Sequence, residues 1–139
     1  VFGNDLGILQ NSNGLYQPNI TNEARSPVYD VSGYEHIRLQ YQRWLNVEDG
    51  LYDKATIYAN DVSVWSNLTS SGTIQHQDQE WRFHDIDLTS EVANNEIQLR
   101  FELSSDGGLE FGGWTIDDVC IIGYNGTPLS DVIFLSGFD

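Results

Sequence analysis

Two groups of acidic residues are the features of this sequence best suited to chemistry. Three carboxylates stand within six residues, beside a glycine, in Glu48-Asp49-Gly50-Leu51-Tyr52-Asp53. A second pair, Asp117 and Asp118, interrupts the apolar run from Trp114 to Val119. A carboxylate buried in such a run has to be hydrogen-bonded, ion-paired or metal-bound, because burying a bare charge is prohibitively costly.

The charge balance favours a cation as the partner of these acids. The 139 residues include 21 acidic and 6 basic side chains, a net charge of −15, so ion pairs cannot serve every carboxylate. Calcium takes several carboxylate and loop carbonyl oxygens at once, and we expect a structural calcium ion. EF-hand spacing is absent, so its ligands have to come from distant segments. In the alternative without a metal, one of Asp117 and Asp118 points to solvent and the other caps a turn.

The same acidic balance excludes several kinds of partner. A nucleic-acid-binding protein needs a basic surface, and an anionic membrane repels this charge. No apolar run reaches the roughly 18–20 residues that span a bilayer. We therefore expect no nucleic acid and no membrane insertion, and a polysaccharide or a cell-surface protein as the possible partner of a monomeric module.

Catalytic motifs are missing from the sequence. The three histidines, His36, His76 and His84, do not have zinc-site spacing, and His84 is expected to be structural. Neither a Gly-x-Ser-x-Gly motif nor a phosphate-binding loop occurs. The many carboxylates leave a glycosidase pair open, but a small sandwich with short turns offers little concavity. We expect no enzymatic activity in the chain itself, although a parent protein can be a hydrolase or peptidase.

Aromatic residues offer a second kind of site. Trp44, Trp81 and Trp114 are expected in the core, where large rings bury much area. Tyr58 and Trp65 fall on a predicted hairpin and are better placed for exposure, which would suit a carbohydrate-binding module.

A single cysteine, Cys120, excludes an internal disulfide and any Cys-rich metal site. Its apolar neighbours predict a small core residue. The chain begins at Val1 and contains no methionine, so we expect a fragment of a longer precursor.

Alternation of apolar and polar residues predicts an all-β fold. Several short runs with period-two patterning are separated by turn-forming Gly, Asn, Asp and Ser, and no long helical periodicity occurs. Seven or eight such strands predict a single antiparallel β-sandwich or jelly roll over residues 1–139. The expected strands are residues 37–45, 55–59, 62–65, 81–88, 97–103 and 114–122, with a final one over 132–135.

The connections carry their own signals. Asn60-Asp61 is a good tight turn between two strands, and residues 88–92 favour one short helical turn with Ser and Thr as caps. The polar stretch over residues 11–25 is expected to form a long loop over one end of the sandwich.

Three longer motifs together resemble a known family. They are the segment Ser26–Gly33, the pattern Leu39-x-Tyr41-x-x-Trp44-Leu45-x-x-Glu48-Asp49-Gly50-x-x-Asp53, and the closing stretch Ser105–Val119 with its Gly-Trp-x-Ile-Asp-Asp-Val element. Over residues 3–122 the chain is similar to the MAM-like, cleaved-adhesin (choice-of-anchor J) jelly-roll modules of bacterial secreted proteins. Such modules occur beside immune-inhibitor-A-type peptidases and among gingipain adhesin domains.

The resemblance implies a jelly roll with a structural calcium ion. Of the two strand acids it favours Asp117 as a ligand over Asp118. The weaker matches to the family's ligands are Asp5, Glu48, Asp49 and Asp53.

The resemblance also implies a non-catalytic accessory or adhesion module at the C-terminal end of a larger secreted or cell-surface protein. Residues 132–139 are similar to the first strand of such modules, or to the closing tail of secreted gammaproteobacterial proteins, which implies a Gram-negative source. The alternatives are a carbohydrate-binding module and a structural or maturation appendage of a secreted peptidase.

Overall fold

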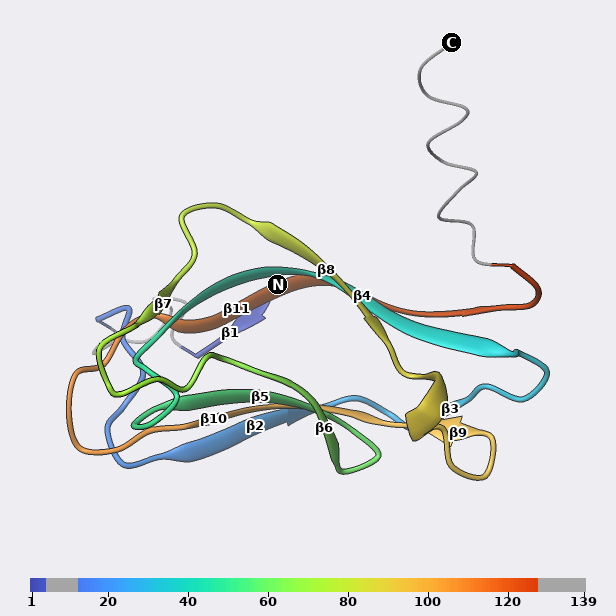
Figure 1. Ribbon diagram of the computed structural model, residues 1–139, viewed down its shortest axis with the longest axis horizontal. Helices are drawn as coiled ribbons and strands as arrows, with labels where there is room; N and C mark the ends of the chain where they lie inside the picture. Colours follow the sequence, from blue (N-terminus) through green and yellow to red (C-terminus); the bar gives the residue numbers. More distant parts are fainter. Residues whose placement is uncertain (5–12, 128–139) are drawn as a thin grey trace, which may run out of the picture.

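Two antiparallel sheets face each other as a β-sandwich in residues 1–4 and 13–127, the part of the chain that the computed structural model describes (Figure 1). Sheet A has the order β1-β11-β4-β7, with β8 also paired to β4. Sheet B has the order β2-β10-β5-β6. Their bounds are β1 (Phe2–Gly3), β2 (Thr21–Arg25), β4 (His36–Val47), β5 (Lys54–Ala59), β6 (Val62–Ser66), β7 (His76–Gln77), β8 (Arg82–Asp87), β10 (Leu99–Ser104) and β11 (Gly113–Tyr124).

Smaller elements complete the described fold. A two-stranded ladder joins β3 (Tyr29–Asp30) to β9 (Glu96–Ile97), and a 3-10 turn covers Thr89–Glu91. The prediction of an all-β antiparallel sandwich is confirmed, and so is the short helical turn after residue 88. Asn60 and Asp61 both have positive φ, 46° and 63°, between β5 and β6, which is the backbone that a tight two-residue hairpin requires.

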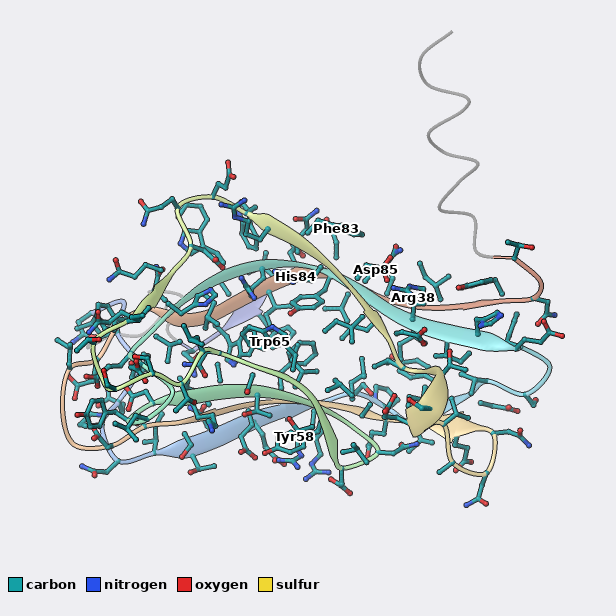
Figure 2. All side chains as sticks on the ribbon, viewed as in Figure 1. Arg38, Tyr58, Trp65, Phe83, His84 and Asp85 are labelled. Atoms are coloured by element: carbon teal, nitrogen blue, oxygen red, sulfur yellow. The ribbon has the colours of Figure 1, made fainter. Side chains whose placement is uncertain are left out.

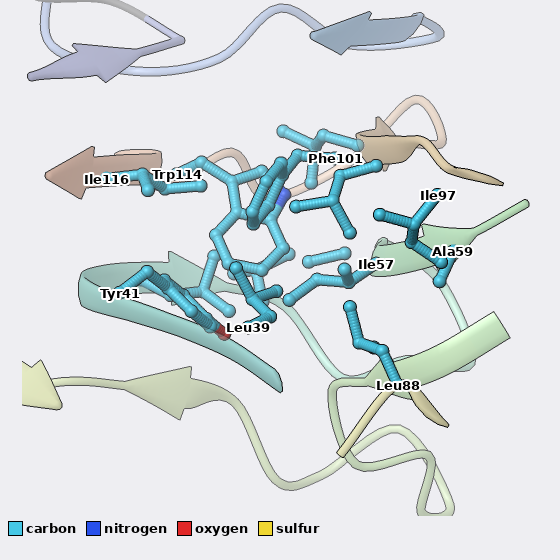
Figure 3. Packing of buried hydrophobic residues seen from close by; sticks show 14 of the residues in the cluster. Leu39, Tyr41, Ile57, Ala59, Leu88, Ile97, Phe101, Trp114 and Ile116 are labelled. Atoms are coloured by element: carbon cyan, nitrogen blue, oxygen red, sulfur yellow. The ribbon is translucent and has the colours of Figure 1, made fainter. Parts of the chain in front are cut away.

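The long strand β4 shows most directly how the sequence builds the core. Every second side chain from Ile37 to Val47 is buried and the intervening ones are half-buried, because successive side chains of a strand point to opposite faces. Its inward residues meet those of sheet B between the two layers (Figure 3). The core residues labelled there are Leu39, Tyr41, Ile57, Ala59, Leu88, Ile97, Phe101, Trp114 and Ile116.

The tryptophans divide between the core and the surface. Trp114 is buried as predicted, at 4% exposure. The prediction is wrong for Trp81, which is 43% exposed, and Trp44 is only half-buried. The reason is strand alternation: Arg43 and Leu45 point inward, so Trp44 between them faces outward, and its ring packs against Trp81 at 6.1 Å.

A register shift in β11 overturns the expected place of Cys120. Asp117 pairs with Gln42 and Cys120 with Gln40, so two residues of β11 oppose the single residue Tyr41 of β4, and one extra residue is inserted. Asp118 has a φ of 50° at this bulge, and a bulge interrupts the simple alternation of a strand. Cys120 is consequently exposed and does not lie in the core.

The stretch over residues 11–25 is not only a loop. Its last five residues form β2, which pairs with β10 along the edge of sheet B. Four of these five side chains are exposed, so the segment lacks the alternation that would have revealed a strand. Residues 132–135, the predicted last strand, lie outside the described residues.

Candidate metal site

Three acidic side chains meet at one end of the sandwich. Figure 1 shows the connections β4–β5, β6–β7 and β10–β11 gathered at that end. There Glu48 and Asp53, from the loop after β4, meet Asp106, from the loop after β10, each with a carboxylate oxygen within 4.8 Å of the others. We call these three residues the acidic triad. Two ligands of one calcium ion can be separated by at most twice the Ca–O distance, about 4.6–5.2 Å, so the triad can hold a metal ion.

Among the described residues, no basic side chain offsets the repulsion between the negative charges of the triad. No arginine, lysine or histidine of residues 1–4 and 13–127 forms an ion pair with a member of the triad. Burial, followed by the negative charges of Asp53 and Asp106, raises the pKa of the Glu48 carboxyl. Within the same described part of the chain no donor reaches the Glu48 carboxylate, although only 8% of the residue is exposed. A bound cation would relieve this arrangement directly.

Two hydrogen bonds hold the Asp53 carboxylate and still leave its oxygens able to coordinate a cation. Its Oδ2 accepts from the Tyr16 hydroxyl at 2.5 Å, and its Oδ1 accepts from the Asp106 amide at 2.8 Å. Each carboxylate oxygen keeps a second lone pair. Asp106 is the most accessible member of the triad, and its Oδ1 accepts from the Gly108 amide at 2.8 Å. The accessible side of the triad is therefore the side of Asp106, where water can complete a coordination shell.

Asp49 supports the loop and does not belong to the triad. It is fully buried, and its carboxylate accepts hydrogen bonds from the amides of Leu51, Ser70 and Ile74 at 3.0, 2.9 and 3.3 Å and from the Ser70 hydroxyl. These donors hold the pKa of Asp49 well below its usual range, against the effect of burial. Asp49, predicted from the sequence as a metal ligand, instead stays negatively charged and links the β4–β5 loop to the β6–β7 loop through these hydrogen bonds.

Asn67 fastens both ends of the same loop. Its amide nitrogen donates to the backbone carbonyls of Glu48 and Asp53, each at 3.0 Å, while its oxygen accepts from the Ala55 amide at 2.9 Å. The residue is buried at 3% exposure. One side chain therefore fixes the backbone of two triad members.

The remaining predicted ligands lie elsewhere. Asp117 and Asp118 are on β11 and the structure does not bring them to the triad. Asp117 accepts hydrogen bonds at 3.0 Å from the Asp118 amide and from the amine of Val1, and Asp118 is exposed. The sixth predicted ligand, Asp5, lies outside the described residues.

The two aromatic residues singled out for sugar binding face opposite ways (Figure 2). Trp65 pairs with Ile57 and lies half-buried between the sheets, where its ring contacts Trp114 at 5.6 Å. Tyr58 is on the outer side of sheet B, and the Arg100 guanidinium covers its ring at 3.8 Å. Trp65 shares a face of sheet B with its partner Ile57, and Tyr58, the next residue on β5, points to the opposite face. The two rings therefore cannot form one flat platform.

Sequence reasoning missed Asp106, Tyr16 and Asn67. Asp106 stands in a Ser-Asp-Gly-Gly loop, and such loops bring acids to cations in many proteins, so this spacing was the available signal. The contributions of Tyr16 and Asn67 depend on contacts across 37 and 19 residues of chain, for which sequence carries no local sign.

The fold and this site define an all-β sandwich with an acidic end that can hold a metal ion. In the described part of the chain no helix is long and apolar enough to cross a bilayer. No family model matches the sequence. A segment of 83 residues, 60% of the chain, is 31% identical to Bacillopeptidase F of Bacillus subtilis, and this chain spans 6% of the length of that protein. The similarity thus concerns a small part of a protein named as a peptidase.

Proposed function

We propose that the chain is a calcium-stabilised, non-catalytic accessory module of a larger secreted bacterial protein. In this role it attaches that protein to a surface, a polymer or a partner protein. The observation that carries the proposal is the acidic triad, whose three carboxylates converge without a cationic side chain among the described residues. The match to a small part of Bacillopeptidase F supports a module that accompanies a peptidase.

Calcium suits the triad better than other common cations. Its carboxylate oxygens are hard ligands and come from two separate loops, the kind of flexible oxygen cage that calcium accepts. Zinc prefers nitrogen and sulfur, and no His or Cys belongs to this group. Magnesium demands a near-ideal octahedron and keeps more of its water.

Thermal unfolding in EDTA, in calcium and in magnesium tests the metal. Calcium sites of extracellular modules have dissociation constants of about 10⁻⁴–10⁻³ M. Calcium at about a hundred times the dissociation constant would add about 2.7 kcal/mol to the free energy of unfolding, which raises the Tm by several degrees. We expect this rise in calcium and a smaller one in magnesium. Elemental analysis of the protein after EDTA treatment identifies an ion that exchanges too slowly to remove.

The variant Glu48→Gln tests the position of the ion through a change of sign. In EDTA it should unfold at a temperature equal to or above that of the wild type, because it removes a desolvated charge from a repulsive cluster. In calcium it should unfold below the wild type, because it removes a ligand. Glu80→Gln, at an exposed residue paired with Arg82, is the matched control and should behave as the wild type in both conditions. Equal calcium responses in Glu48→Gln and the wild type would contradict this site.

A further inference from the structure

The outer face of sheet A carries an aromatic group that the core does not use. Trp44 faces outward from β4, and its ring packs edge-on against Trp81 at 6.1 Å and 84°. Phe83, two residues beyond Trp81 on the neighbouring strand β8, pairs with Gln42. We call Trp44, Trp81 and Phe83 the aromatic corner. Figure 2 shows Phe83 outside sheet A and His84, the next residue along β8, between the two sheets.

The aromatic corner is accessible to a ligand. Trp81 is 43% exposed and Phe83 is 59% exposed, while Trp44, whose ring contacts Trp81, is half-buried. Two large rings this exposed to water contribute little to the core. The alternation of β4 and β8 therefore presents ring surface to solvent.

Polar groups continue from the aromatic corner along the same two strands. Gln40 pairs with Asp85 and donates to its Oδ2 at 3.0 Å, and Arg38 donates to the other oxygen of Asp85 at 2.6 Å. Between these groups and the rings lies Gln42, whose side chain makes no hydrogen bond to any residue in the described ranges. Rings and hydrogen-bonding groups thus form one continuous strip across β4 and β8.

We propose that this strip binds a neutral polysaccharide. The C–H face of a sugar ring carries a slight positive charge and is attracted to the negative face of an aromatic ring, here Trp81 and Phe83. Sugar hydroxyls both donate and accept hydrogen bonds, which matches the free amide of Gln42 and the carboxylate of Asp85.

The charges of the protein select against other partners. A net charge of −15 repels anionic polymers, and Arg38, the basic side chain of this strip, is already paired with Asp85 and Asp87. A stable protein interface needs about 800 Å² on each side with an apolar centre, whereas the aromatic corner consists of three rings bordered by polar side chains.

This inference rests on the proposed attachment role and names its partner. The strip lies on the outer face of sheet A, and the acidic triad lies in the loops at one end of the sandwich. Polysaccharide binding and the calcium response can therefore fail independently.

Affinity electrophoresis in native gels tests the proposal. The probes are hydroxyethyl cellulose, xylan, galactomannan and a soluble β-1,3-glucan, with alginate as an anionic comparison. We expect the wild type to be slowed in at least one neutral gel and not in alginate. Trp81→Ala and Phe83→Ala should each weaken that retardation about tenfold or more, as the loss of a stacked ring implies. Both rings are substantially exposed, so both variants should keep the wild-type Tm; if Trp81→Ala does not fold, Phe83→Ala carries the test.

Two tyrosines elsewhere, the exposed Tyr29 and the half-buried Tyr58, provide the controls. Tyr29→Ala, on β3, and Tyr58→Ala, on the outer side of sheet B, should migrate as the wild type. Unchanged migration in every neutral gel, retardation in alginate alone, or undiminished retardation of both corner variants would each overturn the inference. Loss of retardation in Tyr58→Ala alone would overturn it as well, by placing the sugar on sheet B. A calcium-dependent rise in Tm in a protein that no neutral gel retards would leave the metal proposal standing and remove only this one.

Discussion

The Tyr16 hydroxyl donates a 2.5 Å hydrogen bond to the carboxylate of Asp53. Burial and then the bond to Asp53 raise the pKa of Tyr16, so the phenol stays protonated and remains a donor. The same hydroxyl lies 3.4 Å from the Glu48 amide. One phenol therefore connects the segment before β2 to the loop that supplies two members of the acidic triad.

Replacing this phenol should separate stability from metal binding. Tyr16→Phe keeps the buried ring but removes a hydrogen bond to a charged group, which contributes about 1.5–3 kcal/mol. We expect urea unfolding in EDTA to show a loss of that size, while calcium still raises the Tm because the three ligands remain. A Tyr34→Phe control, at an exposed residue, should leave stability unchanged. Unaltered stability of Tyr16→Phe would mean that the bond to Asp53 contributes nothing.

The β4–β5 loop depends on the absence of a side chain at Gly50. A Cβ there would lie 2.6 Å from the Thr69 hydroxyl and 2.9 Å from the Leu68 carbonyl. The loop has to move to admit it, and overpacking of this kind costs about 1–3 kcal/mol. Gly50→Ala should therefore lower the Tm and, by displacing Glu48 and Asp53, weaken the calcium response in the same titration.

A second glycine gives the matched comparison for this loop. Gly112 has only ordinary contacts around its missing Cβ, the nearest at 3.7 Å. Gly112→Ala should be neutral or slightly stabilising. If both alanine variants lose the calcium response equally, close packing at Gly50 is not what positions the triad.

The parts of the fold that sequence predicts are those with local, periodic causes. The alternation from residue 37 to 47 marks β4 because burial on one face follows directly from the pleat. The Asn60-Asp61 turn is predictable because these residue types tolerate positive φ. By contrast, β2 is an exposed edge strand, and its pairing with β10 leaves no pattern in its own residues.

The candidate site was only half predictable for a related reason. The clustering of Glu48, Asp49 and Asp53 in six residues marks the right loop. It does not say that Asp49 turns away to accept amides, or that Asp106 arrives from another loop. The apolar neighbours of Asp117 suggested burial, but the bulge that places Asp118 at a φ of 50° is a backbone feature that period-two patterning does not predict.

The bulge in β11 leads to a prediction about Cys120. The structure exposes this thiol on the outer face of sheet A. A thiol-reactive chromogenic disulfide should therefore label the folded protein at the rate of an unhindered cysteine. Labelling in urea provides the reference rate. Slow labelling that accelerates only on unfolding would place Cys120 in the core and contradict the register of β11.

Two histidines between the sheets should make the protein less stable in mild acid. Burial, then the charge of Arg43, lowers the pKa of both His76 and His84. The other charged groups acting on this pair are Asp78 and Arg82, and His76 contacts Asp78 at 3.0 Å. A histidine in the unfolded chain takes up a proton near pH 6.5. The unfolded state therefore binds more protons below that pH, and stability falls as the pH decreases from about 6.5 towards the folded pKa.

The measurement for this effect is urea unfolding at about pH 7.5, 6.5 and 5.5, above the range in which most carboxylates titrate. Because solvent partly screens these charges, we expect the free energy of unfolding to decrease by at most about 1 kcal/mol. The raised pKa of Glu48 acts in the opposite direction, because its native state binds the extra proton. The informative comparison is thus between the pH dependence of the wild type and that of a variant. In the double variant His76→Gln, His84→Gln, the histidine-dependent decrease in the free energy of unfolding below about pH 6.5 should be lost. His36→Gln, whose ring stacks on Tyr124 at the end of β4, should keep it. A double variant with the same pH dependence as the wild type would show that neither histidine is held neutral by the space between the sheets.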